Sequence, residues 1–256
     1  MVFTSGATNL VVSDTHGSDD AFVRVSGTTT RVSVSSSGQQ ANDFSGYFSS
    51  ISADGRYVAF NSSATNLVPG DTNDAFDVFV RDRVSGTTTR VSVSSSGQQG
   101  NTESRYPSIS ADGRHLMFRS GASNLVSGDT NGVRDVFVRD RVSGSTIRAS
   151  VSSSGQQGNS DSFGGSISAD GRHVAFYSDA SNLVPGDTNS RYDVFVRDLG
   201  GPVVSDGLFA SLRGATEVPG PRSAPRPPRT STTAASAPPA RSWSTSPPSS
   251  PASRSA

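Results

Sequence analysis

The sequence predicts an all-β protein made of tandem repeats, and three observations support this. Three short motifs recur at a constant spacing of 58 residues. Apolar residues make up only 32% of the chain, while Gly, Ser, Thr and Asp are abundant, which is typical of short strands joined by many turns. The chain also lacks Leu, Ala, Glu and Lys at helical spacing, so no long amphipathic helix is expected.

The recurring motifs indicate how each unit is organised. A period of this length is typical of an architecture in which one unit cannot bury its own apolar faces and therefore depends on its neighbours. The motifs are Ser-Ala-Asp-Gly-Arg at 52–56, 110–114 and 168–172, Gly-Asp-Thr-Asn at 70–73, 128–131 and 186–189, Asp-Val-Phe-Val-Arg-Asp at 77–82, 135–140 and 193–198, and Ser-Ser-Ser-Gly-Gln-Gln at 35–40, 94–99 and 152–157.

Each unit is predicted to contain four antiparallel strands. In the second complete unit we expect strands at 107–110, 115–120, 135–140 and 146–152. A tight turn at 111–114 joins the first two, because Asp and Gly accept the positive φ that such turns need. The third strand is apolar on both faces, so it should be covered on both sides. Sheets stacked around an axis, as the blades of a β-propeller, provide that cover.

Two positions differ between otherwise similar units. Tyr57 stands where the next units have His115 and His173, and Asn61 stands where they have Arg119 and Tyr177. We expect both positions to face solvent or to be loosely packed. By contrast, the Phe of the second strand recurs unchanged as Phe60, Phe118 and Phe176.

One string resembles a known repeat. Residues 50–62 read Ser-Ile-Ser-Ala-Asp-Gly-Arg-Tyr-Val-Ala-Phe-Asn-Ser and are followed by Asp-Val-Phe-Val-Arg-Asp. This pattern resembles the WD40-like propeller repeat of TolB-type proteins over residues 1–198. The resemblance implies an extracytoplasmic binding or scaffolding domain, sometimes attached to a hydrolase, and it transfers no catalytic residue. Two features depart from that repeat: Ala53, Ala111 and Ala169 stand where it usually has Pro, and a unit of 58 residues exceeds the usual length of about 40–45.

The expected organisation is an incomplete ring followed by a tail. We predict a partial blade at 1–48, blades at 49–106 and 107–164, a partial blade at 165–205 and a disordered Pro/Ser/Ala/Arg-rich tail at 206–256. The tail composition offers too little apolar surface to offset the entropy of ordering. A propeller has four to eight blades, so these units indicate part of a longer protein or a truncated gene product, with open blade edges that favour self-association.

One loop pattern has the ligand types of a Ca²⁺ site. Oxygen-bearing residues at loop positions 1, 3 and 7 begin a Ca²⁺-loop arrangement, and the triplets between them differ among the units. The same residues also suit a structural role, because Asp and Asn side chains cap their own turns. Both interpretations stay open. The candidate ligands are Asp71, Asn73 and Asp77, then Asp129, Asn131 and Asp135, then Asp187, Asn189 and Asp193, with Asp14, His16 and Asp20 as a poorer set in the partial unit.

Composition excludes several other functions. The formal net charge is zero, which does not favour nucleic acid. The chain has no Cys, so disulfides and thiolate metal sites are excluded, and no apolar run is long enough to span a membrane. No nucleophile elbow, P-loop or Rossmann motif is present. We therefore expect a non-catalytic module that binds an unidentified protein or small molecule. The alternatives are a propeller domain of a secreted hydrolase and a Ca²⁺-stabilised surface repeat protein.

Overall fold

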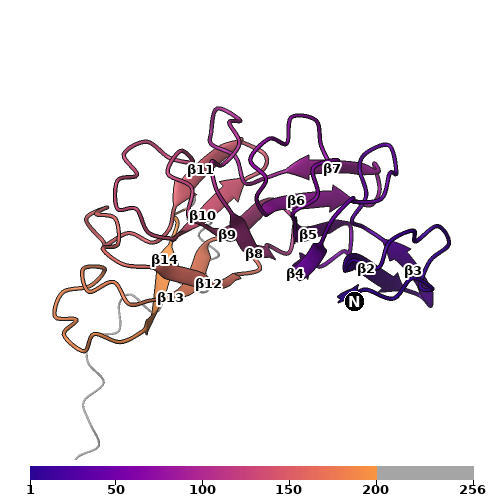
Figure 1. The fold of residues 1–256 in the computed structure, drawn as a ribbon. Helices are drawn as coiled ribbons and strands as arrows, with labels where there is room; N and C mark the ends of the chain where they lie inside the picture. Colours follow the sequence, from indigo (N-terminus) through magenta and orange to yellow (C-terminus); the bar gives the residue numbers. More distant parts are fainter. Residues whose placement is uncertain (201–256) are drawn as a thin grey trace, which may run out of the picture. The chain divides into compact units, whose positions relative to one another are not determined.

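The computed structural model describes residues 1–200, which contain β-strands and no helix (Figure 1). The predicted tail at 206–256, and the last residues of the preceding unit, lie outside the described residues. The strands are β1 (Val2–Ser5), β2 (Asp20–Val25), β3 (Thr28–Arg31), β4 (Ser45–Ile51), β5 (Tyr57–Ser62), β6 (Asp77–Asp82), β7 (Thr87–Arg90), β8 (Ser104–Ile109), β9 (His115–Ser120), β10 (Asp135–Asp140), β11 (Ser145–Arg148), β12 (Ser162–Ile167), β13 (His173–Ser178) and β14 (Asp193–Asp198).

The strands form four antiparallel sheets in chain order. Two sheets are complete, with the orders β4-β5-β6-β7 and β8-β9-β10-β11. The first sheet, β1-β2-β3, and the last, β12-β13-β14, have three described strands each. The prediction of an all-β fold of tandem four-stranded sheets that form no closed ring is therefore confirmed within residues 1–200. The residue limits assigned to the individual units remain predictions.

The strand predictions for the second complete unit were accurate in the middle of the sheet. β9 and β10 have the predicted bounds of 115–120 and 135–140. The first strand begins three residues earlier than expected, at Ser104, and the fourth ends at Arg148 rather than 152. The early start is caused by a β-bulge in β8, which lets the chain stay paired with β9 on both sides of an irregular segment.

The first strands of successive sheets adjoin one another. β4 contacts β8, and β8 contacts β12. In each complete sheet the chain then runs outward through strands that are neighbours both in sequence and in space. This is the arrangement of propeller blades, in which the first strand of every blade lies nearest the axis.

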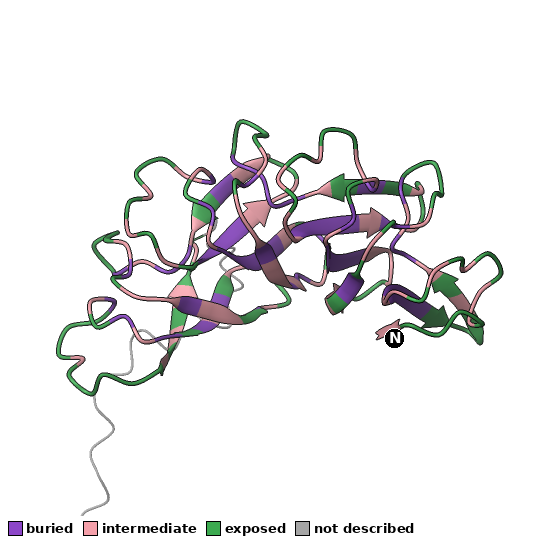
Figure 2. Cartoon of the chain, in the orientation of Figure 1, coloured by how far each residue is buried: buried purple, intermediate pink, exposed green. Residues whose placement is uncertain are grey.

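The core lies between the sheets. Val78 and Val80 of β6 pack in one cluster with Leu116, Phe118 and Phe137 of the following sheet. Equivalent clusters join the first sheet to the second and the third to the last. Figure 2 shows that the buried residues are concentrated in the two middle sheets. Because each fully buried Phe stabilises the fold by about 1.5–3 kcal/mol, the sheets depend on one another for their stability.

Backbone hydrogen bonds also join neighbouring sheets at the Ser-Ala-Asp-Gly-Arg turns. The Ala53 N–H donates to the Ala111 carbonyl at 3.0 Å, and the Ala111 N–H donates to the Ala169 carbonyl at 2.9 Å. A proline has no N–H and could not make these bonds. Ala53 and Ala111, which depart from the TolB-type pattern, therefore have a physical role, since each connects its turn to the turn of the next unit.

The connector that follows one sheet forms hydrogen bonds with the next sheet. These contacts account for part of the unusual length of the repeat. Thr88 of β7 donates from its N–H to Ser36 Oγ at 2.9 Å and from its hydroxyl to the Val34 carbonyl at 2.6 Å. Arg81 of β6 donates to the Ser35 carbonyl at 3.0 Å. The next junction repeats all three contacts one period later, through Thr146 and Arg139. We call this set of contacts the connector clasp.

One expectation about packing was wrong. Asn61 is fully buried and Arg119 is 9% exposed, so this position does not face solvent in the second and third sheets. Asn61 accepts a hydrogen bond from the Phe48 N–H, and Arg119 lies over the Tyr106 ring. Only Tyr177, in the last sheet, is exposed. The bulged first strand covers this position in the middle of the chain, and a bulge is not visible in a simple alternating pattern.

The alanine turn contacts can be tested by substitution. We expect Ala111→Pro to lower the free energy of unfolding by about 1 kcal/mol more than Ala169→Pro, because a typical intramolecular hydrogen bond contributes about that much. Ala169 is the matched control, since its N–H has no backbone acceptor within residues 1–200. Urea denaturation of both variants measures the difference. Equal losses would show that the bond between turns contributes nothing.

Two ion pairs predict how stability depends on pH. Hydrogen bonds from the Arg56 guanidinium hold the pKa of Asp82 well below its usual value, and Arg114 does the same for Asp140. A depressed carboxyl pKa stabilises the fold at pH values above the unfolded value of about 3.9, and this stability is lost as pH falls toward the lower folded value. We therefore expect the double variant Asp82→Asn/Asp140→Asn to lose less stability than the wild type between pH 6 and pH 3, measured by thermal unfolding. A parallel decline in both proteins would contradict this.

Candidate functional site

The predicted loop residues meet at the start of the third strand of each sheet. In the second sheet Asp77 is fully buried, and its carboxylate accepts hydrogen bonds from Ser92 Oγ at 2.6 Å and from Gln99 Nε2 at 2.8 Å. The same Gln99 amide donates to Asp71 at 2.9 Å. Asn73 lies close by and donates to the Gly100 carbonyl. Two recurring motifs that are far apart in the sequence, the Asp loop and the Gln connector, therefore form one polar network.

In each of the two complete sheets, an arginine of the fourth strand lies beside the loop carboxylates. Arg148 is 3.1 Å from Asp129 and 3.5 Å from Asp135. Arg90 is 3.5 Å from Asp77 in the preceding sheet. Because the arginine side chains are themselves more than nine-tenths buried, their charge acts at close range on the carboxylates. Asn131 also donates to Asp135, at 2.9 Å.

The first sheet has the same arrangement around Asp14 and Asp20. Arg31 is 3.2 Å from Asp14 and 3.1 Å from Asp20. In residues 1–200, these two carboxylates and His16 are the one group of acidic or histidine side chains whose ligand atoms lie close enough to hold a metal ion. The third predicted loop keeps the Asn contact, since Asn189 donates to Asp193 at 3.0 Å. It differs in that no arginine within the described residues pairs with Asp187 or Asp193.

The charges in these networks favour pairing of the carboxylates with groups of the protein itself over pairing with a metal ion. Burial raises the pKa of Asp77 and of Asp135, although the Ser, Gln, Asn and Arg groups around them act in the opposite direction. Burial also raises the pKa of Asp129. A Ca²⁺ ion needs 6–8 oxygen ligands, and in the first three sheets it would have to displace a guanidinium and an amide that already satisfy the carboxylates. Calcium binding remains a prediction, and the contacts support the structural role of these loops.

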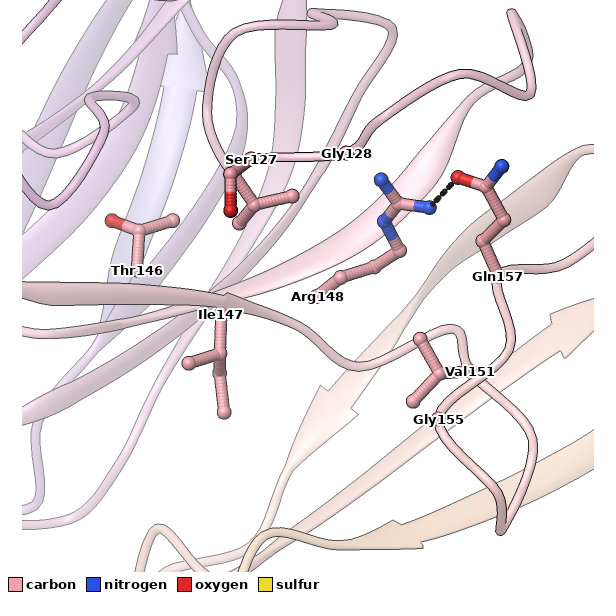
Figure 3. A pocket seen from close by; sticks show the side chains of 9 residues that line it. Ser127, Gly128, Thr146, Ile147, Arg148, Val151, Gly155 and Gln157 are labelled. Carbon is pink, nitrogen blue, oxygen red and sulfur yellow. Dashed lines mark hydrogen bonds between the residues drawn. The ribbon is translucent and has the colours of Figure 1, made fainter.

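A cavity of about 380 Å³ lies beside the third-sheet network. Figure 3 shows Arg148 and Gln157 at its edge, joined by a hydrogen bond. Thr146 and Ile147 of β11 line another part. Most of these residues recur in the neighbouring units, so the cavity follows from the common design of the repeat and does not distinguish one unit from another.

A second region distinguishes the units strongly. Many positions at which the repeats differ lie at one end of the sheets, where the first and third strands begin and the second strand ends, and they contact one another. We call this set the variable surface. Its residues are Phe44, Tyr47, Phe48, Phe76, Glu103, Arg105, Tyr106, Arg119, Arg134, Asp161, Phe163, Tyr177 and Tyr192.

Charged contacts form the centre of the variable surface. Glu103 has Arg105 at 3.0 Å, Arg134 at 3.4 Å and Arg119 at 3.6 Å. Arg134 also pairs with Asp161 at 3.3 Å. Three guanidinium groups therefore face these two carboxylates, and a third carboxylate, that of Asp19, lines the adjoining cavity with Arg105. Burial lowers the pKa of Arg119, the most enclosed of the three cations.

Aromatic side chains surround this charged centre. The Arg105 guanidinium lies 3.8 Å from the centre of the Phe76 ring, and the Arg119 guanidinium lies 4.5 Å from that of Tyr106. Tyr106 in turn packs against Phe48 of the preceding sheet. Guanidinium groups stacked on rings are attracted by the ring quadrupole and keep their edge N–H groups directed outward.

The aromatic contacts continue into the last sheet. The Phe163 and Tyr177 rings are stacked with centres 5.0 Å apart. Tyr192 packs edge-on against both rings. Tyr177 and Tyr192 are exposed, so this end of the variable surface presents open aromatic faces.

The bulges in the first strands create this surface. The pairing of β4 with β5 shifts between Ser45 and Ser49, and equivalent shifts occur in β8 and β12. The bulged residues leave the regular alternation of the strand, so their side chains can turn toward neighbouring sheets. Tyr106 shows the local cost, since it has a φ of 59° in the left-handed region that non-glycine residues rarely adopt.

Two cavities open on the variable surface. One of about 370 Å³ is lined by Asp19, Phe44, Ser45, Tyr47, Phe76 and Arg105. The other, of about 390 Å³, lies over the bulges and includes Tyr106 and two glycines of β12. Sequence reasoning missed this site because no single loop differs from the others. The signal was nevertheless present, since the differing positions of three similar repeats could have been considered together.

Comparisons with known proteins found distant similarities to solved structures. No protein-family model and no curated protein sequence matches it. It is similar to TolB from Acinetobacter baumannii, with 19% identity, a TM-score of 0.43, and coverage of 73% of this chain and 36% of that one. For TolB from Agrobacterium tumefaciens the values are 18%, 0.42, 72% and 54%. For the β-propeller domain of the Trilobed protease from Pyrococcus furiosus they are 12%, 0.39, 72% and 47%.

The chain matches between about a third and a half of the length of each of these proteins. Separately, residues 1–200 include no helix with the length and apolar character needed to cross a membrane.

The role of the loop carboxylates can be decided by calcium titration. We expect the melting temperature of the full chain to be the same in excess Ca²⁺ and in excess chelator, because the Asp129 and Asp135 carboxylates are already paired with Arg148. Removing that charge with Arg148→Met should lower the melting temperature in both conditions, since an unpaired buried carboxylate is costly. A rise in the wild-type melting temperature with Ca²⁺ would instead support the metal site.

Proposed function

We propose that this chain is a non-catalytic β-propeller module that binds a protein or another ligand through its variable surface. The observation that carries the proposal is the convergence of the repeat differences. The repeats share their core, turns and connectors, yet the positions that changed most in chemistry contact one another at one end of the sheets. The shared positions are explained by structural constraints that act on every unit. The differing positions are explained by a ligand whose chemically different groups contact different units.

The chemistry of the variable surface supports recognition by contact. Tyr and Arg are enriched at the energetically important positions of protein interfaces, and they act best beside partly enclosed pockets. Here Arg105 and Phe76 border a cavity, while Phe44 and Tyr47 are exposed at its rim.

The variable surface offers no arrangement that would support catalysis. Its carboxylates, Glu103 and Asp161, are both paired with arginines. Within residues 1–200 neither carboxylate group forms a hydrogen bond with a serine or histidine side chain, and their hydrogen-bond partners are arginines. The proposal therefore assigns this surface to binding.

A peptide selection experiment tests the proposed binding. The immobilised full chain should enrich specific sequences from a random peptide library. A triple variant, Phe44→Ser/Tyr47→Ser/Tyr192→Ser, should reduce binding of the selected peptides by about tenfold or more, since exposed aromatic anchors dominate such contacts. All three residues are more than half exposed, so their replacement should leave the fold intact.

The matched control changes two apolar residues that are equally exposed but distant in the repeat from the variable surface. Val84→Ser/Val142→Ser alters the turns before β7 and β11, where the valines are 75% and 76% exposed. This variant should bind like the wild type. If the control and the triple variant bind the selected peptides equally well, the variable surface is not the binding site.

A further inference from the structure

The last sheet has an open face where the other sheets are covered. Val194 and Val196 of β14 are 78% and 69% exposed, whereas the equivalent valines of β6 and β10 are at most 2% exposed. These equivalents are Val78, Val80, Val136 and Val138. β14 alternates between exposed and half-buried residues along its whole length, while β6 and β10 each begin with four buried residues. Apolar side chains exposed together in this way mark an interaction surface.

The first sheet has a corresponding opening on its other side. In the three later sheets one Ala and one Leu of the loop after the second strand pack against the preceding sheet, and they are at most 4% exposed. The equivalents in the first sheet are Ala7, which is exposed, and Leu10, which is half-exposed. The buried counterparts are Ala64, Leu67, Ala122, Leu125, Ala180 and Leu183.

These two openings are the two halves of one kind of junction. The chain builds that junction three times, between the first and second, second and third, and third and last sheets. In every case two apolar residues of the third strand face the Ala and Leu of the next sheet's loop. The surface that complements Val194 and Val196 is therefore the side of a sheet that presents such an Ala and Leu, and within residues 1–200 only the first sheet has this side open.

We propose that the last sheet of one copy packs against the first sheet of a second copy, with Val194 and Val196 facing Ala7 and Leu10 of that second copy. This contact would extend the stacking that already operates inside the chain. It is heterologous, because two different surfaces meet, so it either closes into a ring or continues into an open chain of copies. Two copies that closed at both junctions would give a ring of eight sheets, which is within the range of known propellers.

The test compares two variants that each disable one half of the junction. The last-sheet variant is Val194→Asp/Val196→Asp, and the first-sheet variant is Ala7→Asp/Leu10→Asp. Sedimentation velocity of the full chain should show concentration-dependent association of the wild type. Each variant alone should associate at least about tenfold more weakly, because a desolvated carboxylate opposes the contact. Thermal unfolding checks that each variant is folded.

A mixture of the two variants identifies the geometry. The last-sheet variant keeps an intact first sheet, and the first-sheet variant keeps an intact last sheet, so a mixture should form one-to-one dimers although each variant alone stays monomeric. The control Val84→Asp/Val142→Asp introduces the same charges at equally exposed turn positions and should associate like the wild type.

Three outcomes would overturn the proposal. A wild type that stays monomeric at all concentrations would show that the open faces do not bind a second copy. A first-sheet variant that associates like the wild type would indicate packing of two last sheets against each other. A mixture that remains monomeric would show that the two openings do not fit together.

Discussion

The structure depends on burying one carboxylate, Asp20, Asp77 or Asp135, at the start of the Asp-containing strand in each of the first three sheets. Asp77 has no contact with water, so its charge must be balanced within the protein. The balancing groups come from different parts of the repeat: Ser92 follows the fourth strand, Arg90 belongs to it, and Gln99 comes from the connector. The Asp loop, the fourth strand and the Gln connector recur as separate motifs in the sequence, but all three are needed to balance this buried carboxylate. Their shared spacing follows from this requirement, because changing any partner would leave a buried polar group unsatisfied.

The common parts of the repeat and its variable parts are separated in space. The networks around Asp77 and Asp135 and the turns at Ala111 are needed in every unit, so they tolerate little change. In the first strands, the residues on either side of the bulge pair with the second strand, whereas the bulged residues between them are free of this constraint. This leaves Tyr106 able to differ from its equivalents, and the same bulge directs it toward the neighbouring sheet. The scaffold therefore provides positions where chemistry can change without loss of the fold.

The sequence was sufficient for the fold and insufficient for the site, for identifiable reasons. β9 and β10 were predicted at their bounds because an Asp-Gly turn and an apolar run leave few alternatives. The three-residue error at Ser104 and the wrong expectation for Arg119 both arise from bulges, which interrupt the alternation on which strand prediction depends. The partners of the loop carboxylates were also hidden, because Arg148 is distant in sequence from Asp129 and Gln99 is distant from Asp71, so that they meet only through sheet pairing and connector folding.

The connector clasp has a consequence for how the molecule unfolds. Residues 34–36 follow the first sheet in the chain, yet they hold Thr88 of the second sheet, and residues 93–95 hold Thr146 of the third in the same way. Separating two neighbouring sheets therefore breaks the hydrogen bonds between the connector of one and the fourth strand of the next. Loss of one sheet must release the edge strand of the next, which couples adjacent units energetically. An array of this kind melts as a block of mutually dependent sheets instead of shedding its units one at a time.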